Sequence, residues 1–236
     1  MTISRQIRRA ASAVMDMMCP PSCVSCGADG GFLCVACLQN AVRIDVAPQC
    51  RACAMPLQSG GLCGACATDP PPLARLDAVY AYDGPIRAAI HAFKYSDLRA
   101  LAPELGTPMA EALRRRRRQP QALLPVPLHP GKLRRRGYNQ AELLASHVSR
   151  QTGVPVAADI LRRVRDSPPQ ARAGSMADRA AQVAGAFETD SRLVGGLDVA
   201  LVDDVCATGS TIHSAAQVLL DAGAARVSGL VLAKEL

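Results

Sequence analysis

The chain has 236 residues, which suits one ordinary domain or a small module joined to one domain. Hydrophobic residues make up 49% of it, which excludes global disorder, and aromatic residues only 3%, which leaves an aliphatic core of the kind that parallel sheets have. The net charge of +7 favours polyanions, phosphates or anionic lipid as partners, and no apolar run is long enough to span a bilayer.

The first eighteen residues combine three arginines with a short apolar stretch at 10–18. Asp16 interrupts that stretch and no small-residue cleavage site follows, so a basic amphipathic helix over 1–18 is favoured over the alternative of a signal peptide. Such a helix allows a loose contact with a membrane surface. We therefore expect a cytoplasmic protein that can also be peripheral to the membrane.

Cysteines cluster near the N-terminus, with nine of the ten between Cys19 and Cys66. Eight of them form four Cys-x-x-Cys pairs: Cys23, Cys26, Cys34, Cys37, Cys50, Cys53, Cys63 and Cys66. A gap of two residues lets both sulfurs of a pair face one metal ion, and two such pairs supply four thiolates. The repeated spacing predicts a double zinc ribbon over 19–70 that holds two structural Zn2+ ions.

Three alternatives to this arrangement stay open. Disulfides would need an oxidising compartment, and an iron–sulfur cluster would use the same thiolates. In the third alternative the first pair shares a metal with the third, and the second with the fourth. Cys19 falls outside the pattern and is expected to be a buried thiol. A module this small cannot fold on hydrophobic burial alone, so zinc would contribute about 10 kcal/mol per site.

A proline-rich stretch at 68–72 separates this module from a larger domain over 74–236. Hydrophobic patterning in that domain predicts, in chain order, a strand over 76–82, helices over 86–95 and 100–118, a strand over 122–128, a helix over 133–150, a strand over 199–205, a helix that stops at Gly223, and a strand over 226–233. This alternation indicates an α/β domain with a mostly parallel sheet flanked by helices. The long basic segment 155–187 has no periodicity, as is typical of lids and disordered segments.

The sequence VALVDDVCATGST at 199–211 carries the strongest functional signal. An apolar strand ends in two carboxylates, and a loop of small and hydroxyl-bearing residues then opens a helix. Backbone N–H groups at the start of a helix bind phosphate, so the predicted phosphate contacts are Ala207, Thr208, Gly209, Ser210 and Thr211. Asp203 and Asp204 can accept hydrogen bonds from sugar hydroxyls and hold Mg2+ through water. The segment lacks the lysine of a P-loop and the Gly-x-Gly of a dinucleotide site.

This segment resembles the 5-phosphoribosyl-1-diphosphate (PRPP) motif of type I phosphoribosyltransferases. The resemblance implies that the acidic pair holds ribose hydroxyls and that 207–211 wraps the 5-phosphate, although Ala207 stands where that family often has threonine. Further segments resemble the ComF branch of the superfamily: FKY at 93–95, PVPL at 125–128, RGYNQ at 136–140 and GAF at 185–187. Together with the cysteine module, they make the whole chain similar to ComF proteins, which are associated with DNA uptake during natural competence.

The resemblance also implies a pyrophosphate loop at Leu128, His129 and Lys132. It implies a flexible lid over 162–179, in which Arg163 and Arg165 could reach a diphosphate. Tyr138 and Phe187 are the best candidates to stack a base, and no catalytic residue is assigned.

Two functions are compatible with these features. The first is a nucleic-acid-handling accessory factor in DNA uptake that keeps a pocket for PRPP, or a related ribose phosphate, with Mg2+; its partners would include single-stranded DNA and competence proteins. The second is an active phosphoribosyltransferase that displaces pyrophosphate from PRPP onto an unknown acceptor. The arginine run 114–118 is either a solvated helix end or a contact to the DNA backbone.

Overall fold

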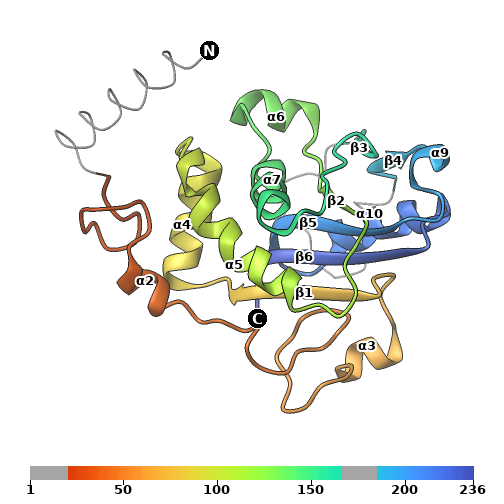
Figure 1. Ribbon diagram of the computed structural model, residues 1–236, viewed down its shortest axis with the longest axis horizontal. Helices are drawn as coiled ribbons and strands as arrows, with labels where there is room; N and C mark the ends of the chain where they lie inside the picture. The colour runs from red at the N-terminus through yellow and green to blue at the C-terminus, as the bar shows by residue number, and fades with distance from the viewer. Residues whose placement is uncertain (1–20, 166–184) are drawn as a thin grey trace.

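The computed structural model describes residues 21–165 and 185–236. A parallel sheet with the strand order β1-β6-β5-β2 forms the centre of the larger domain (Figure 1). Its strands are β1 (Arg75–Ala81), β2 (Ala122–Pro125), β5 (Asp198–Cys206) and β6 (Arg226–Lys234). They are rich in aliphatic residues because both faces of the sheet are covered. The predicted α/β fold with a mostly parallel sheet is therefore confirmed.

Helices cover the two faces of the sheet and create two cores. The first core joins α4 (Gly84–Tyr95), α5 (Ala102–Arg114) and α7 (Gln140–Thr152) to one face, and the second joins α10 (Ser210–Asp221) to the other. Alternate residues of β5 serve the two cores, with Val202 in the first and Leu201 in the second. The shorter elements are η1 (Arg99–Leu101), α6 (Pro130–Arg136) and α9 (Ser191–Val194).

The helix predicted over 133–150 is two helices, α6 and α7. Gly137 ends α6 with a left-handed φ of +77°, which favours glycine. Asn139 then caps α7, because its side-chain oxygen accepts a hydrogen bond from the backbone N–H of Ala141 at 3.1 Å. The single-helix prediction is wrong because the local turn chemistry overrides the apolar periodicity.

Helix α5 ends at Arg114, the first residue of the arginine run 114–118 and four residues earlier than predicted. The chain then returns toward the sheet. Arg116 is buried and donates hydrogen bonds to Asp77 at 2.6 Å, to Ser228 Oγ at 3.0 Å and to the carbonyl of Gly229 at 2.5 Å. Two neighbouring arginines also pair with carboxylates: Arg115 with Asp45 and Arg118 with Asp198. Arg116 therefore has a structural role, whereas the other four arginines of the run are exposed, as expected for a solvated helix end.

The cysteine module is attached along the outer edge of β1. Its two halves include the short helices α2 (Val35–Gln39) and α3 (Gly64–Thr68), and Figure 1 shows one half beside α4 and the other beyond β1. Between the halves, Ile44 donates its N–H to the carbonyl of Val79, and Ala81 donates to the carbonyl of Val42, both at 2.9 Å. Backbone pairing with β1 thus fixes the module to the larger domain in addition to the segment at 68–72.

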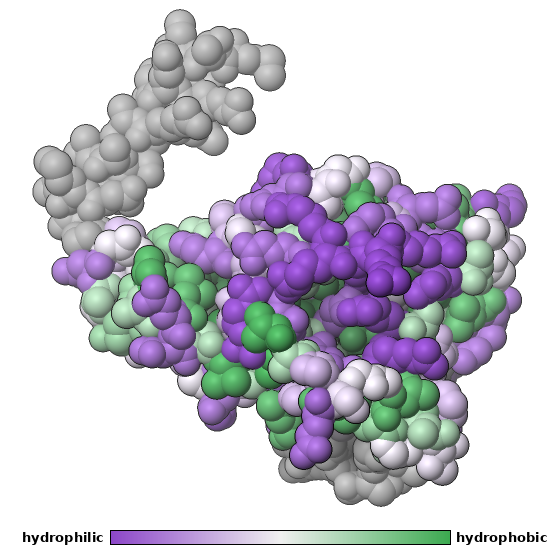
Figure 2. Space-filling view, turned by 60° about the horizontal axis from the view of Figure 1, so that its bottom comes forward, coloured by the Kyte–Doolittle hydropathy of each residue, from purple (hydrophilic) through white to green (hydrophobic). Residues whose placement is uncertain are grey.

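Part of the segment that was expected to be irregular is regular. β3 (Leu161–Arg163) and β4 (Phe187–Thr189) form a small antiparallel sheet, while the rest of the expected lid lies outside the described residues. The helix expected over 1–18 and Cys19 also lie outside them. Within 21–165 and 185–236, no helix combines the length and hydropathy needed to cross a membrane. In the view of Figure 2, the larger domain is mostly hydrophilic with small apolar patches.

Candidate functional site

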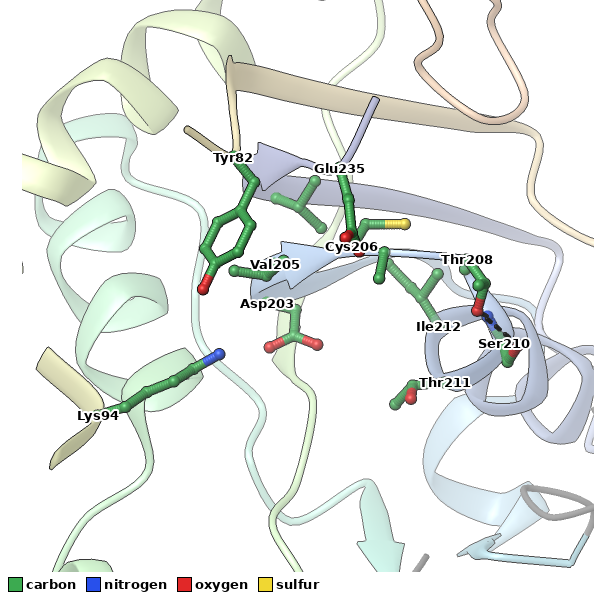
Figure 3. Close-up of a pocket in the computed structure, with 13 residues that line it drawn as sticks. Tyr82, Lys94, Asp203, Val205, Cys206, Thr208, Ser210, Thr211, Ile212 and Glu235 are labelled. Atoms are coloured by element: carbon green, nitrogen blue, oxygen red, sulfur yellow. Dashed lines mark hydrogen bonds between the residues drawn. The ribbon is translucent and has the colours of Figure 1, made fainter. Parts of the chain in front are cut away.

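A cavity of about 240 Å³ opens where β5 meets the start of α10 (Figure 3). The loop and first turn at 206–212 form one side of it. Tyr82, Lys94, Asp203 and Glu235 line the rest, from α4 and the carboxyl ends of β1, β5 and β6. Ligands of parallel α/β sheets bind at this end of the strands. The structure therefore brings all five predicted phosphate contacts, at 207–211, together with Asp203.

The loop before α10 is shaped to receive an anion. Gly209 caps the helix with a left-handed φ of +85°, which leaves the N–H groups of the first turn outside the helical hydrogen-bonding pattern. The hydroxyl groups of Thr208 and Ser210 lie 2.8 Å apart at the same turn. The Ser210 N–H makes only a long hydrogen bond, at 3.4 Å, to the Thr208 hydroxyl. The N–H groups of this turn and the helix dipole together favour a bound phosphate, and the hydroxyls add further donors.

His213 lies behind this loop and makes glycine necessary at position 209. A Cβ atom on Gly209 would stand 2.6 Å from Cε1 of the His213 ring. In the described structure, His213 Nε2 is buried without a hydrogen-bond partner, and burial lowers the pKa of the imidazole. The ring is therefore neutral near pH 7, and it lies against Gly209 without belonging to the cavity lining.

The two carboxylates of the motif have different surroundings because adjacent residues of a strand point to opposite faces. Asp203 lines the cavity, whereas Asp204 is buried and pairs with Lys94 Nζ at 2.9 Å. Burial, together with the charge of Asp204, raises the pKa of Asp203 to about 7. Burial lowers the pKa of Lys94, but the charges of Asp204 and Asp203 outweigh that effect and raise it overall. Lys94 is therefore a charged ammonium group between the carboxylates.

Lys94 is a site residue that the sequence did not assign. It lies at the carboxyl end of α4, far from the motif in sequence, and the only available signal was its place in the FKY segment. Lys234 was missed as well. It is buried at the end of β6 and donates hydrogen bonds to the carbonyl of Ala207 and, at 2.8 Å, to that of Glu235, which fixes the phosphate loop.

The predicted pyrophosphate loop follows β2, the strand that pairs with β5, and its residues do not belong to the cavity lining. Leu128, His129 and Lys132 follow β2, and His129 caps α6 by accepting a hydrogen bond from the N–H of Gly131 at 3.2 Å. The cap gives His129 a structural role.

The described part of the expected lid holds Arg163 and Arg165. Neither of them belongs to the lining of the cavity. Arg163 also lies over the Phe187 ring at 5.3 Å and donates to the carbonyl of Arg165 at 3.3 Å. The role of Arg163 and Arg165 toward a diphosphate therefore stays a prediction.

Neither aromatic residue proposed to stack a base is available to do so. Tyr138 and Phe187 are both buried. The Tyr138 hydroxyl donates to the carbonyl of Phe93, and Phe187 belongs to the core beside α10. The prediction is wrong because both side chains fill the interior of the domain.

The eight paired cysteines form two separate clusters of four, and within each cluster the Sγ atoms lie within 4.8 Å of one another. The first cluster joins the first two Cys-x-x-Cys pairs and the second joins the last two, so the alternative pairing of first with third is wrong. Cys26 Sγ and Cys34 Sγ are 3.6 Å apart, and Cys53 Sγ and Cys63 Sγ are 3.7 Å apart. A disulfide needs about 2.05 Å.

The clusters fit the donor set of structural zinc. Burial raises the pKa of Cys23 and Cys50, but hydrogen bonds from backbone N–H groups lower it by more, to about 6 in both. The N–H of Cys34 donates to Cys23 Sγ at 3.4 Å, and the N–H of Cys63 donates to Cys50 Sγ at 3.3 Å. One thiol of each cluster thus ionises near neutral pH, whereas the pKa values of Cys37, Cys53 and Cys66 are raised. A bound zinc ion would deprotonate the remaining thiols, and four ligands per cluster leave no open position.

Family comparisons agree with this architecture. The double zinc ribbon domain model matches residues 14–67 and the phosphoribosyl transferase domain model matches residues 135–235. The protein is therefore a double zinc ribbon joined to a phosphoribosyltransferase domain. A solved structure of glutamine PRPP amidotransferase from B. subtilis is 21% identical, with a TM-score of 0.39. The match covers 56% of this chain and 26% of the amidotransferase chain.

Two curated relatives cover most of the chain. The DNA utilization protein YhgH of Salmonella typhimurium is 32% identical over 200 residues, which are 82% of this chain and 86% of the relative. Competence protein F of Haemophilus influenzae is 32% identical over 210 residues, 86% of this chain and 90% of the relative. The chain belongs to the ComF family.

Proposed function

We propose that the protein binds PRPP, or a related ribose 5-phosphate, in the cavity between β5 and α10 and acts in the handling of nucleic acid during DNA uptake. The observation that carries the proposal is the phosphate-shaped loop 207–211 beside the cavity-facing carboxylate of Asp203. A phosphate suits the loop and a sugar hydroxyl suits the carboxylate, and the two lie on one cavity wall. A ribose 5-phosphate presents these two groups together.

Lys94 gives the two carboxylates separate tasks. It neutralises Asp204, which leaves Asp203 as the group that accepts hydrogen bonds from the ribose. Magnesium ions prefer oxygen ligands and keep several waters, so Asp203 could hold Mg2+ through water when a diphosphate is bound. The ion would supply charge neutralisation for the diphosphate, and Arg163, from the predicted lid, could add a second positive charge.

The role in DNA uptake rests on the relatives, two of which are named for DNA utilization and for competence. The net charge of +7 is compatible with a polyanionic partner. Clustered thiolates fit a reducing compartment, so we propose that the protein lies in the cytoplasm. Its partners there would be competence proteins, and its basic N-terminal segment would contact the membrane surface.

Calorimetry with Mg2+ and PRPP at pH 8, where Asp203 is mostly ionised, tests the pocket. Asp203→Asn should weaken binding at least about tenfold, because the amide replaces a charged acceptor. Asp190→Asn is a matched control, since this carboxylate pairs with Arg192 at 2.6 Å and is absent from the cavity lining. Equal affinity of wild type and Asp203→Asn would reject the assignment. Steady release of pyrophosphate with an added base or amine would instead identify an active transferase.

A further inference from the structure

An exposed aromatic residue stands on the outer side of the last turn of α4. Tyr95 is 67% exposed, whereas Phe93 is buried in the core of the domain. The Tyr95 ring is flanked on two sides: the His91 ring centroid lies 4.8 Å away at a tilt of 49°, and the Arg136 guanidinium lies 5.3 Å from the ring centroid. A flat side chain framed by a cation is a surface on which a nucleobase can stack.

The RGYNQ segment holds this arrangement in place. The Tyr138 hydroxyl and, at 3.1 Å, the Gln140 side-chain amide both donate to the carbonyl of Phe93, which ties the start of α7 to the end of α4. Arg136 Nη1 in turn donates to Gln140 Oε1 at 2.7 Å. The cation beside Tyr95 is therefore fixed before any ligand arrives, which reduces the entropy that binding would cost.

The helix that carries Arg136 bears further positive charge. No residue of α6 is buried, and Arg134 and Arg135 are exposed on it. A shallow groove of about 710 Å³ lies along α4 and reaches the first zinc ribbon at Val24, and Arg87 and His91 belong to its lining.

The acidic residues nearby are already engaged. Asp83 in the groove caps α4 by accepting a hydrogen bond from the N–H of Gly84 at 2.7 Å. Asp97 pairs with Arg99 at 2.8 Å. The surface therefore keeps a positive balance around an exposed ring.

We infer that the platform formed by His91, Tyr95, Arg134, Arg135 and Arg136 is a contact surface for single-stranded nucleic acid. Unpaired bases can stack on Tyr95 while the arginines meet the backbone phosphates, whereas a duplex keeps its bases stacked inside. The inference rests on the proposed role in DNA handling. It prefers this platform to the arginine run 114–118, in which Arg115, Arg116 and Arg118 pair with carboxylates. It names a surface separate from the PRPP cavity.

Fluorescence anisotropy with a labelled oligothymidylate, measured at several salt concentrations, tests the platform. Tyr95→Ala should weaken binding about tenfold and leave the salt dependence unchanged, because it removes stacking and no charge. Arg134→Gln with Arg135→Gln should lower the slope of log affinity against log salt by about 1.4, the value for two phosphate contacts. Tyr95→Phe should retain affinity. Arg192→Gln, at a side chain 87% exposed on α9, should retain both affinity and slope.

The outcomes separate this inference from the proposed function. If the wild type binds the oligonucleotide and the Tyr95 and Arg134/Arg135 variants bind equally well, the platform is rejected and DNA handling stands. If the wild type does not bind the oligonucleotide even at low salt, both the platform and the role in DNA handling are rejected. The affinity for PRPP still tests the cavity. If phosphatidylserine vesicles bind in its place and the same variants abolish that binding, the surface is a lipid contact. Zinc content and PRPP affinity verify that each variant is folded.

Discussion

Substituting Gly209 by alanine tests the link between backbone conformation and phosphate binding. A left-handed φ of +85° costs an alanine about 1–2 kcal/mol. The new Cβ would also lie 2.6 Å from His213 Cε1, so either the loop or the ring must move. We expect the free energy of unfolding to fall by about 2–3 kcal/mol. PRPP affinity should fall at least about tenfold, because displaced N–H groups lose hydrogen bonds to a charged phosphate.

Urea denaturation and calorimetry measure the two effects, and the chain provides a matched control. Gly153 ends α7 with a φ of +78°, and a Cβ there would meet nothing within 4 Å. Gly153→Ala should therefore incur only the conformational cost and leave PRPP affinity intact. Adding His213→Ala to Gly209→Ala removes the overlap and should restore part of both losses. The reasoning is refuted if Gly209→Ala is as stable as Gly153→Ala and binds PRPP like the wild type.

Three further predictions concern charge and metal. Because the folded-state pKa of Asp203 is about 7, above its ordinary 3.8, the folded protein retains this proton longer, and stability is lost as the pH rises between these values. Asp203→Asn should thus gain stability over the wild type in urea at pH 8 but not at pH 4; an equal difference at both would contradict it. Arg116→Met removes one of the two guanidinium partners of buried Asp77 and leaves Arg75 at 2.6 Å, so it should cost about 1.5–3 kcal/mol in urea denaturation. Adding Asp77→Asn should recover part of that loss, and a loss below about 0.5 kcal/mol would argue against the buried pair. Cys37→Ser should lower the zinc content from about two ions per chain to about one by elemental analysis, and unchanged content would reject Cys37 as a ligand.

The features predicted best from the sequence are those built from neighbouring residues. The pairs from Cys23 to Cys66 form metal clusters through short local loops, so their spacing alone favours the observed grouping. The motif at 199–211 is likewise a single strand, loop and helix start. Its hydroxyl and glycine residues fix the phosphate loop without help from distant parts of the chain.

Features that depend on long-range contacts were missed. Lys94 enters the site only because α4 packs across the end of β5, and no spacing rule connects it with Asp204. Arg116 was expected on an exposed surface because the carboxylate that neutralises it lies on another element, at Asp77. Tyr138 was expected to contact ligand because the sequence could not show that its hydroxyl reaches the carbonyl of Phe93.

Helix α4 links the two surfaces through adjacent residues. Lys94 points inward to Asp204, and Tyr95 points outward from the same turn. A ribose diphosphate that draws Lys94 away from Asp204 would shift this turn, and with it the ring beside Arg136. Thermodynamic linkage is reciprocal, so an oligonucleotide on Tyr95 would then change PRPP affinity by the same factor by which PRPP changes oligonucleotide affinity. The position of Lys94 and Tyr95 on one helical turn would then couple the two proposed sites.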